Sequence, residues 1–417
     1  MAASAAAPPD DGIYVPAPAT SQSEADAYTR YELLAPGSGK FKITYEVTAT
    51  TAGAKSFYNP IRRGSVASDE AVFDAMTGRP LQFEVVSGDE ARKDPLMPDA
   101  DRDTDYIKVT LARPVPANGQ GRLIIVKTYE DPKSYFLDGE TLVFDRSLGI
   151  RRNKVVLPAG YEVVGLTVPS QILTETDGRI GVSFVNGMES EAPLVLRAAK
   201  GARTGAAAAP RPATDKPSWE SPFEGETEKD RLSERAHQDR DIVYFLQKPE
   251  THAFQLYHDY TESRPGINGY ANVVRKGSTA SAPSARILDT GELLEAKEMS
   301  GAEMTAMKIN AGETVDPDAR VVVIPFEAVK PGQSLRLRIA ETYTAPVSYR
   351  LDGDELVFDR SLGRPRNAVV LPSGWYCTFS SIPATVSRLP DGRVRLDYWN
   401  GRPEPVAVLL KARRRAP

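Results

Sequence analysis

The sequence predicts an all-β protein made of two tandem β-sandwich domains, Ig-like or jelly-roll-like, that arose by internal duplication. Residues 127–200 align with residues 341–414 without a gap, and roughly 30 of the 74 positions are identical. Apolar residues alternate with a period of two, as in half-buried strands. Asp-Gly turns separate these runs, and no helix long enough for a βαβ crossover interrupts them.

Seven segments of the first unit have the alternation and the β-branched and aromatic content of strands. They are residues 41–50, 106–112, 121–130, 141–147, 154–158, 161–168 and 179–185. Hairpin turns are expected at 137–139 and 176–179, and at 351–353 and 390–393 in the second unit, because Asp-Gly supplies the positive φ that tight turns need.

The duplication sets the expected domain boundaries. Residues 1–27 form a low-complexity Ala/Pro-rich arm, 28–200 the first unit, 201–240 an Ala/Pro-rich and then charged linker, and 241–414 the second unit. We expect the linker to tether the units rather than to fuse them. The longest apolar runs, 123–129 and 321–326, are far shorter than the ~20 residues of a membrane span.

Composition limits the possible partners. The net charge of −4 and the pI near 5.7 give no basic surface for nucleic acid, so none is expected as a partner. Cys377 is the single cysteine, which excludes an intramolecular disulfide.

The small residues at the start are typical of the region beside a signal-peptidase site, which predicts a periplasmic or secreted protein with its leader removed. A disordered start of a cytoplasmic protein is the alternative.

Motifs for catalysis are missing from the sequence. The three histidines lack zinc-site spacing such as H-E-x-x-H, no Gly-x-Ser-x-Gly is present, and no phosphate-binding loop is written. We therefore expect a noncatalytic protein with no metal and no cofactor. Two carboxylates from distant strands would suffice for glycoside hydrolysis, so that alternative stays open.

A polar set is repeated in both units. It could hold a carboxylate or a sugar, because a guanidinium beside an amide offers fixed donors. We favour a structural interpretation, in which an Asp/Arg pair and an Asn tie down a long turn. The set comprises Asp145, Arg146, Arg152 and Asn153 in the first unit and Asp359, Arg360, Arg366 and Asn367 in the second. The same interpretation applies to Asn59 and Arg62, repeated as Asn272 and Arg275.

Two aromatic residues of the second unit are candidate binding residues. Trp375 and Tyr398 align with Tyr161 and Phe184, so they are expected in the core. Tyr376 and Trp399 follow them and should point the other way. If these two side chains are exposed, they would form a platform for a sugar or a protein partner. The alternative is that the linker or an edge element covers them.

The run LRLRIAETYTAPVSYRLDGDELVF, residues 335–358, resembles the β-sandwich modules that precede catalytic domains in bacterial metallopeptidases. The resemblance implies a noncatalytic β-sandwich, since the H-E-x-x-H motif is absent from the 417 residues.

We expect a noncatalytic exported binding or structural protein that has a protein partner or self-assembles through the extended arm, whose residues 12–18 would add to a neighbouring sheet edge. The alternatives are a carbohydrate-binding protein or carboxylate-based glycosidase, and a cytosolic scaffold.

Overall fold

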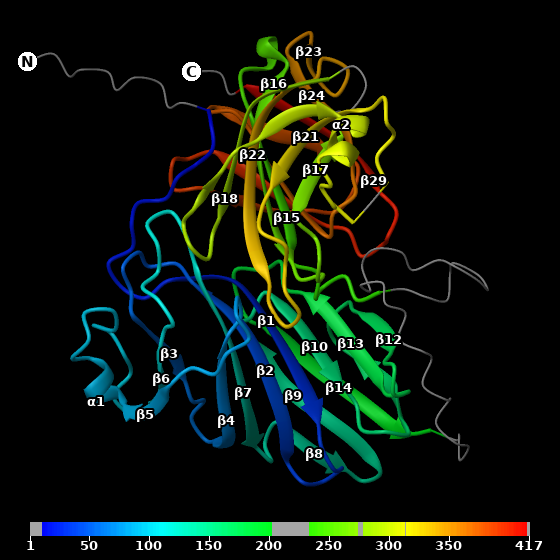
Figure 1. Cartoon of the computed structure of the whole chain (residues 1–417). Helices are drawn as coiled ribbons and strands as arrows, with labels where there is room; N and C mark the ends of the chain where they lie inside the picture. Colours follow the sequence, from blue (N-terminus) through cyan, green and yellow to red (C-terminus); the bar gives the residue numbers. More distant parts are fainter. Residues whose placement is uncertain (1–10, 202–232, 274–277, 313, 415–417) are drawn as a thin grey trace, which may run out of the picture.

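The computed structural model describes residues 11–201, 233–273, 278–312 and 314–414. Residues 1–10 of the expected arm, residues 202–232 of the expected linker and Arg275 lie outside this part. The described chain forms two β-rich halves, the first below the second in Figure 1. This arrangement confirms the predicted all-β class with two tandem sandwiches.

The first half contains three sheets. Their strand orders are β12-β13-β10-β1-β2-β7-β4, β11-β14-β9-β8 and β3-β6-β5. The strands are β1 (Glu24–Leu33), β2 (Lys40–Ala49), β3 (Ser56–Pro60), β4 (Val66–Asp74), β5 (Phe83–Ser87), β6 (Asp105–Thr110), β7 (Gly121–Glu130), β8 (Tyr135–Asp138), β9 (Thr141–Leu148), β10 (Arg152–Val156), β11 (Tyr161–Leu166), β12 (Gln171–Thr174), β13 (Ile180–Val185) and β14 (Ala192–Lys200), with one short helix, α1 (Gly88–Ala91).

The second half also contains three sheets, ordered β19-β18-β22-β16-β15-β25-β28-β27, β23-β24-β29-β26 and β17-β21-β20. The elements are β15 (Arg240–Leu246), η2 (Pro249–Thr251), β16 (Ala253–Glu262), β17 (Gly269–Val273), β18 (Thr279–Ile287), β19 (Leu293–Leu294), β20 (Lys297–Ser300), α2 (Gly301–Ala306), β21 (Arg320–Pro325), β22 (Leu335–Thr344), β23 (Tyr349–Asp352), β24 (Glu355–Leu362), β25 (Arg366–Val370), β26 (Trp375–Ser380), β27 (Thr385–Arg388), β28 (Val394–Trp399) and β29 (Val406–Arg414).

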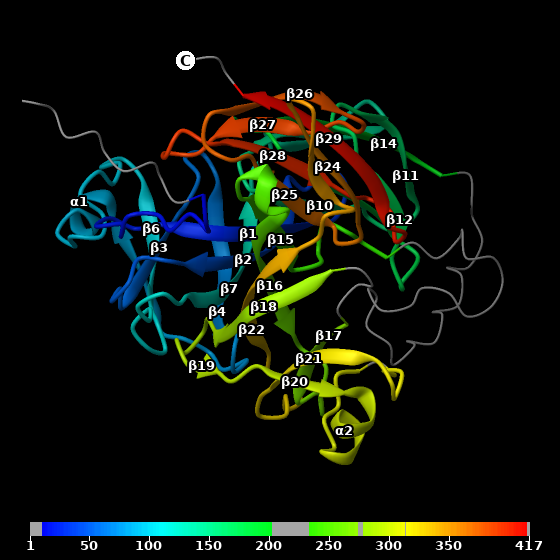
Figure 2. The same cartoon turned by 90° about the horizontal axis from the view of Figure 1, so that it is seen from above.

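The two halves repeat the same topology, except that β19 of the second half has no counterpart strand in the first. In each, the first strand pairs parallel with a strand from the repeated block, β1 with β10 and β15 with β25. The second strand of each half, β2 or β16, pairs antiparallel with the first. On its other side it pairs antiparallel with β7 or β22. The short helices α1 and α2 lie at separate places on the periphery (Figure 2). The duplication thus extends over each whole half.

Aromatic rings from facing sheets meet in each core. Phe41 on β2 and Phe144 on β9 are fully buried, with ring centres 5.4 Å apart in an edge-on arrangement. Phe254 and Phe358 repeat this contact at 5.9 Å. Alternation places every second residue of these strands in the core, and edge-on packing suits aromatic rings.

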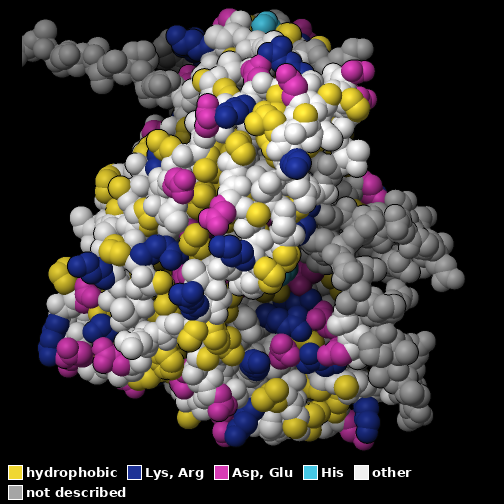
Figure 3. All heavy atoms as spheres, in the orientation of Figure 1, with side chains coloured by type: hydrophobic (Ala, Val, Ile, Leu, Met, Phe, Trp, Pro, Cys, Tyr) yellow, Lys and Arg dark blue, Asp and Glu magenta, His cyan; other side chains and the backbone are white. Residues whose placement is uncertain are grey.

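Figure 3 shows basic and acidic side chains interspersed over the visible face of both halves. In the described part of the chain, no helix is long and apolar enough to cross a membrane.

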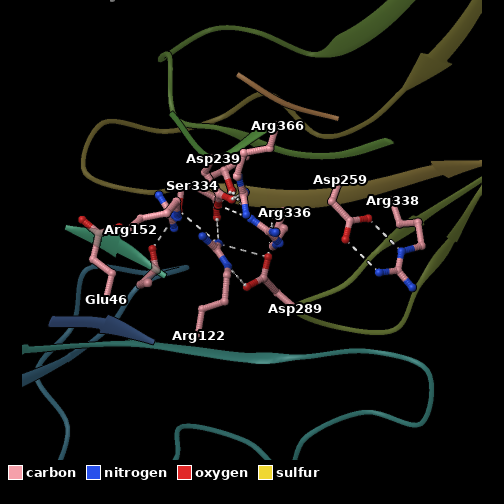
Figure 4. A network of polar contacts seen from close by, with 12 residues as sticks. Glu46, Arg122, Arg152, Asp239, Asp259, Asp289, Ser334, Arg336, Arg338 and Arg366 are labelled. Atoms are coloured by element: carbon pink, nitrogen blue, oxygen red, sulfur yellow. Dashed lines mark hydrogen bonds and ion pairs between the residues drawn. The ribbon is translucent and has the colours of Figure 1, made fainter. Parts of the chain in front are cut away.

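A buried ion pair joins the two halves (Figure 4). Arg122 on β7 binds both carboxylate oxygens of Asp289, with Nε 2.6 Å from Oδ1 and Nη2 3.1 Å from Oδ2. The Asp289 side chain is fully buried and also accepts a hydrogen bond from the backbone N–H of Arg336. Arg336 is the counterpart of Arg122 in the repeat and pairs with Asp239.

Residues just before β15 pack between the halves. Arg235 and Ala236 are buried, and Arg235 donates to the carbonyls of Gly363 and Asn400 in the second half. Arg152 of the first half donates to the carbonyls of Ala236 and His237. This end of the expected linker therefore fills the interface and holds the halves against each other.

The first described residues lie against the second half. Asp11 accepts a hydrogen bond from the Ser373 N–H, and the Gly12 carbonyl accepts one from Arg393. Ile13 donates to Gln255 and packs, with Tyr14, on the apolar face of Val243, Phe245, Ala368 and Val370. The chain then continues along the side of the second half before it enters β1 (Figure 1).

We predict that Asp289→Ala lowers the stability of the protein by about 3 to 5 kcal/mol, because Arg122 is left buried without its counter-charge. Glu130→Ala is the control: its pair with Lys40 is half-exposed, so the loss should stay below about 1 kcal/mol. Urea unfolding followed by fluorescence measures both. Equal shifts of the two midpoints would contradict a role for the buried pair.

Candidate functional site

A cavity of about 550 Å³ lies inside the first half. Its walls come from β1, β2 and β7 of the seven-stranded sheet, from β3 and β6 of the three-stranded sheet, from Arg146 on β9 and from residues 96–100. Polar side chains dominate its lining; they include Glu24, Thr29, Tyr31, Tyr45, Tyr58, Asn59, Arg62, Asp99, Tyr106, Lys127, Tyr129 and Arg146.

Lys127 is the most unusual residue of this lining. The buried positions of β7 alternate, so Leu123, Ile125, Lys127 and Tyr129 all point toward the core. Lys127 is only 4% exposed. A lysine therefore occupies a position at which the strand pattern calls for an apolar residue.

Within the described residues, Lys127 has a neutral hydrogen-bond partner and no carboxylate to pair with. Its Nζ donates to Oδ1 of Asn59 at 2.5 Å and lies 4.8 Å from the ring centre of Tyr129. The Arg146 guanidinium lies 5.7 Å from the same ring centre. Burial and, to a lesser degree, Arg146 lower the pKa of Lys127 to about 7, while the charge of Glu70 opposes part of that fall.

The structure separates Arg146 from Asp145. Asp145 is exposed, whereas Arg146 points into the core, because neighbouring residues on a strand face opposite sides. Arg146 instead pairs with Asp131 at 3.0 Å and also contacts the Ser134 hydroxyl. Arg146 therefore takes its carboxylate from Asp131, just after β7, which is not a member of the repeated polar set.

An acidic group lies on another wall of the cavity. The Tyr45 hydroxyl contacts both carboxylate oxygens of Glu24 at 3.3 Å. Burial raises the pKa of Glu24, and the hydrogen bond from Tyr45 opposes part of that rise. On β2, Ile43 pairs with Lys127, and Tyr45 is the next residue on the same face. The Glu24–Tyr45 pair is thus a near neighbour of the amine.

The second half carries the opposite charge at the equivalent position. Glu341 on β22 replaces Lys127, and Asn272, the counterpart of Asn59, now donates Nδ2 to its Oε1 at 2.7 Å. The amide serves either charge because it carries both an acceptor and donors. Burial raises the pKa of Glu341 to about 7. The other oxygen, Oε2, is buried without a hydrogen-bond partner among the described residues.

Arg360, the counterpart of Arg146, has lost its acidic partner, since Ala345 stands where the first half has Asp131. Its guanidinium carbon lies 5.3 Å from the ring centre of Phe254 and 5.7 Å from that of Tyr343. Arg146 makes the equivalent contacts with Phe41 and Tyr129, so the cation–π contacts are common to both halves and only the ion pair is lost. Asp359, like Asp145, is exposed.

The remaining repeated polar residues lie near the interface. Asn153 and Asn367 donate Nδ2 to the carbonyls of Ile150 and Arg364, three residues earlier, at 2.6 and 2.7 Å. Arg152 and Arg366 are buried between the halves, where Arg366 lies 3.6 Å from Asp239. Each asparagine thus holds the loop that precedes its strand.

The candidate aromatic residues lie on different sheets. Tyr376 belongs to β26 of the four-stranded sheet and Trp399 to β28 of the eight-stranded sheet, and both are half-buried. The indole N–H of Trp399 is buried without a hydrogen-bond partner among the described residues. Trp375 and Tyr398 are buried in the core. Glycan binding by Tyr376 and Trp399 stays a prediction.

Lys127 was missed in the sequence, although a signal for it exists. The strand segment GRLIIVKTYE places Lys127 in register with Leu123 and Ile125, and the repeat places Glu341 in register with Ile339. A charge at an inward position of an alternating strand, present in both copies with opposite sign, marks an unusual core site. In the part of the chain that the structure describes, no group of three or more His, Cys, Asp or Glu could hold a metal ion.

Comparison with known proteins gives only remote matches. No protein-family model and no curated protein matches the sequence. Among solved structures, an M1 zinc metallopeptidase from Deinococcus radiodurans matches with TM-score 0.30 and 12% identity over 43% of this chain and 42% of its own. A two-domain M1 zinc metallopeptidase mutant bound to L-tryptophan matches with TM-score 0.29 and 12% identity over 46% and 45%.

An aminopeptidase N family protein from Idiomarina loihiensis matches with TM-score 0.26 and 12% identity, over 41% of this chain and 29% of its own length. The chain therefore spans less than half the length of these proteins. Matches with TM-scores this low assign neither an activity nor a ligand.

We predict that Lys127→Met stabilises the protein at neutral pH and that its advantage disappears as the pH rises. The unfolded lysine titrates near 10.5 and the folded one near 7, so the unfolded state binds more protons between these values and wild-type stability rises with pH. The difference in the free energy of unfolding between Lys127→Met and wild type should fall from on the order of 4 kcal/mol at pH 7 to near zero above pH 10.5. Urea unfolding across this range measures it; a constant difference would contradict a depressed pKa.

Glu341→Gln should show the opposite dependence in acid. The folded carboxyl titrates near 7 and the unfolded one near 4.5, so the folded state binds more protons between them and wild-type stability falls as the pH rises. As the pH rises from 4.5 to 7, the free energy of unfolding of the variant should increase by about 3 kcal/mol relative to that of wild type. If unfolding midpoints of the two proteins run parallel over this range, Glu341 is not protonated in the fold.

Proposed function

We propose that the protein is a noncatalytic binding protein whose first half holds a small organic anion in the cavity beside Lys127. The main support is the buried amine of Lys127. Among the described residues, its hydrogen-bond partner is the amide of Asn59, and no carboxylate forms an ion pair with it. A buried charge is stable only when a counter-charge or good acceptors reach it. A bound carboxylate or phosphate would supply both.

The balance of charges supports an anionic ligand. Lys127, Arg146 and Arg62 line the cavity, against Glu24 and Asp99. Burial favours the protonated, uncharged form of Glu24, which reduces the negative charge further. Arg146 donates a hydrogen bond from Nη1 to Asp131. Its guanidinium is planar, and the arrangement of its N–H groups matches carboxylate and phosphate oxygens.

Size and lining favour a small molecule with an apolar body. About 550 Å³ is within the range of small-molecule sites. Five tyrosines line the cavity and offer ring faces for an organic group and hydroxyls for its polar atoms. They are Tyr31, Tyr45, Tyr58, Tyr106 and Tyr129. The proposal does not use the arm for assembly, because residues 11–13 bind their own chain.

The test is calorimetric titration of the full chain with small carboxylates and phosphate, in buffers of different ionisation enthalpy. Binding should be accompanied by proton uptake at pH 7.5 to 8.5, because an anion beside Lys127 stabilises the ammonium and raises the pKa of the amine from about 7. Lys127→Met should weaken binding by about 1.5 to 3 kcal/mol, the usual value of a hydrogen bond to a charged group, and abolish the uptake.

Lys42→Gln is the matched control. Lys42 lies on the neighbouring strand β2 and is exposed, so its loss should leave affinity and proton uptake unchanged. Binding that is equally strong in Lys127→Met, or that responds to Lys42→Gln alone, would refute the cavity as the site.

A further inference from the structure

We propose that Lys127 is a covalent binding residue that forms a reversible imine with a small 2-oxo acid held in the cavity. The inference rests on the proposed function, since it assigns a chemical class to the anion that this cavity binds. Lys127 supplies the nucleophile and Arg146 the site for the carboxylate.

The position of the amine suits nucleophilic addition. Lys127 lines the cavity, and its Nζ spends one of its three hydrogen-bonding positions on Asn59. Among the described residues no carboxylate pairs with it, so no ion pair locks the amine in its charged form. Burial beside the Arg146 guanidinium keeps the pKa of Lys127 at about 7, so about half of the amine is neutral at that pH. A desolvated lysine next to another cation is a known way to obtain a nucleophilic amine.

The second cation explains why the carbonyl compound should be an acid. Lys127 Nζ and the Arg146 guanidinium both lie within 6 Å of the ring centre of Tyr129. In a 2-oxo acid the carboxylate is bonded directly to the carbonyl carbon, so the molecule offers a reactive carbon to Lys127 and a negative charge to the nearby Arg146 guanidinium. A simple aldehyde would leave the guanidinium unused.

The reaction balances without any co-reactant. The neutral amine adds to the carbonyl carbon, a C–N bond forms, and proton transfer from nitrogen to oxygen gives a carbinolamine. The hydroxyl then leaves as water while the nitrogen loses its second proton, which yields the imine. Glu24, which burial keeps protonated to higher pH, and the Tyr45 hydroxyl bonded to it lie on the neighbouring strands and can protonate the departing hydroxyl.

The second half is an internal control. Glu341 occupies the position of Lys127, so the equivalent position of the second half has no amine to react. The prediction is therefore one modified residue per chain, at Lys127.

The experiment is reductive trapping of the full chain with pyruvate and cyanoborohydride, followed by peptide mapping. Near pH 7 the neutral fraction of Lys127 exceeds that of a surface lysine of pKa near 10.4 by roughly a thousand-fold, so Lys127 should be modified first. Its rate should level off above pH 7, whereas that of a surface lysine of ordinary pKa should keep rising. Lys127→Arg, which keeps the charge, and Lys127→Met should both lose the adduct.

Lactate separates the two proposals, because it carries the carboxylate and lacks the carbonyl. Lactate and pyruvate binding in calorimetry without an adduct at Lys127 would overturn the imine and leave anion binding intact. Failure of both to bind, with no adduct, would overturn both proposals. Modification spread evenly over surface lysines would also overturn the imine.

Discussion

The buried ion pair between Arg122 and Asp289 fixes the two halves of this protein against each other. Each charge has lost its water and depends on the other, so the pair resists any separation of the halves. The residues around it come from repeated positions: Arg336 is the counterpart of Arg122, and Arg366 that of Arg152. Duplication thus placed the same arginines on both sides of the interface. Asp289 pairs with Arg122, and Asp239 pairs with Arg336 and Arg366.

Inside each half a second constraint applies, because an ionisable side chain occupies an equivalent core position in both sandwiches. The first half has Lys127 there and the second has Glu341. Burial pushes both pKa values toward neutrality from opposite directions. The asparagine at the equivalent neighbouring position serves both: Asn59 accepts a hydrogen bond from Lys127, and Asn272 donates one to Glu341. The duplicated fold can therefore support two chemically complementary environments on one scaffold, and the two copies need not share a ligand.

Much of the fold could be predicted from the sequence, because the repeat and the period-two alternation are local signals. The strand at 121–130 was found with the bounds of β7. The first strand, β1, was missed because its residues, EADAYTRYEL, are mainly polar and small, and because its pairing with β10 is a long-range contact.

The site was harder to predict than the fold. The repeat drew attention to Asp145 because it is present in both copies, whereas Asp131, the partner of Arg146, is absent from the second copy and left no repeated signal. Arg152 and Arg366 repeat because each is buried where the halves meet, a contact that no pattern within one unit reveals.

The contact of the N-terminal segment with the second half has a consequence for synthesis on the ribosome. Asp11 is made 362 residues before its partner Ser373, and Gly12 is made 381 residues before its partner Arg393. Ile13 and Tyr14 must remain without their apolar surface until β15 and β25 have been made. Seating of this segment therefore follows the synthesis of most of the second half.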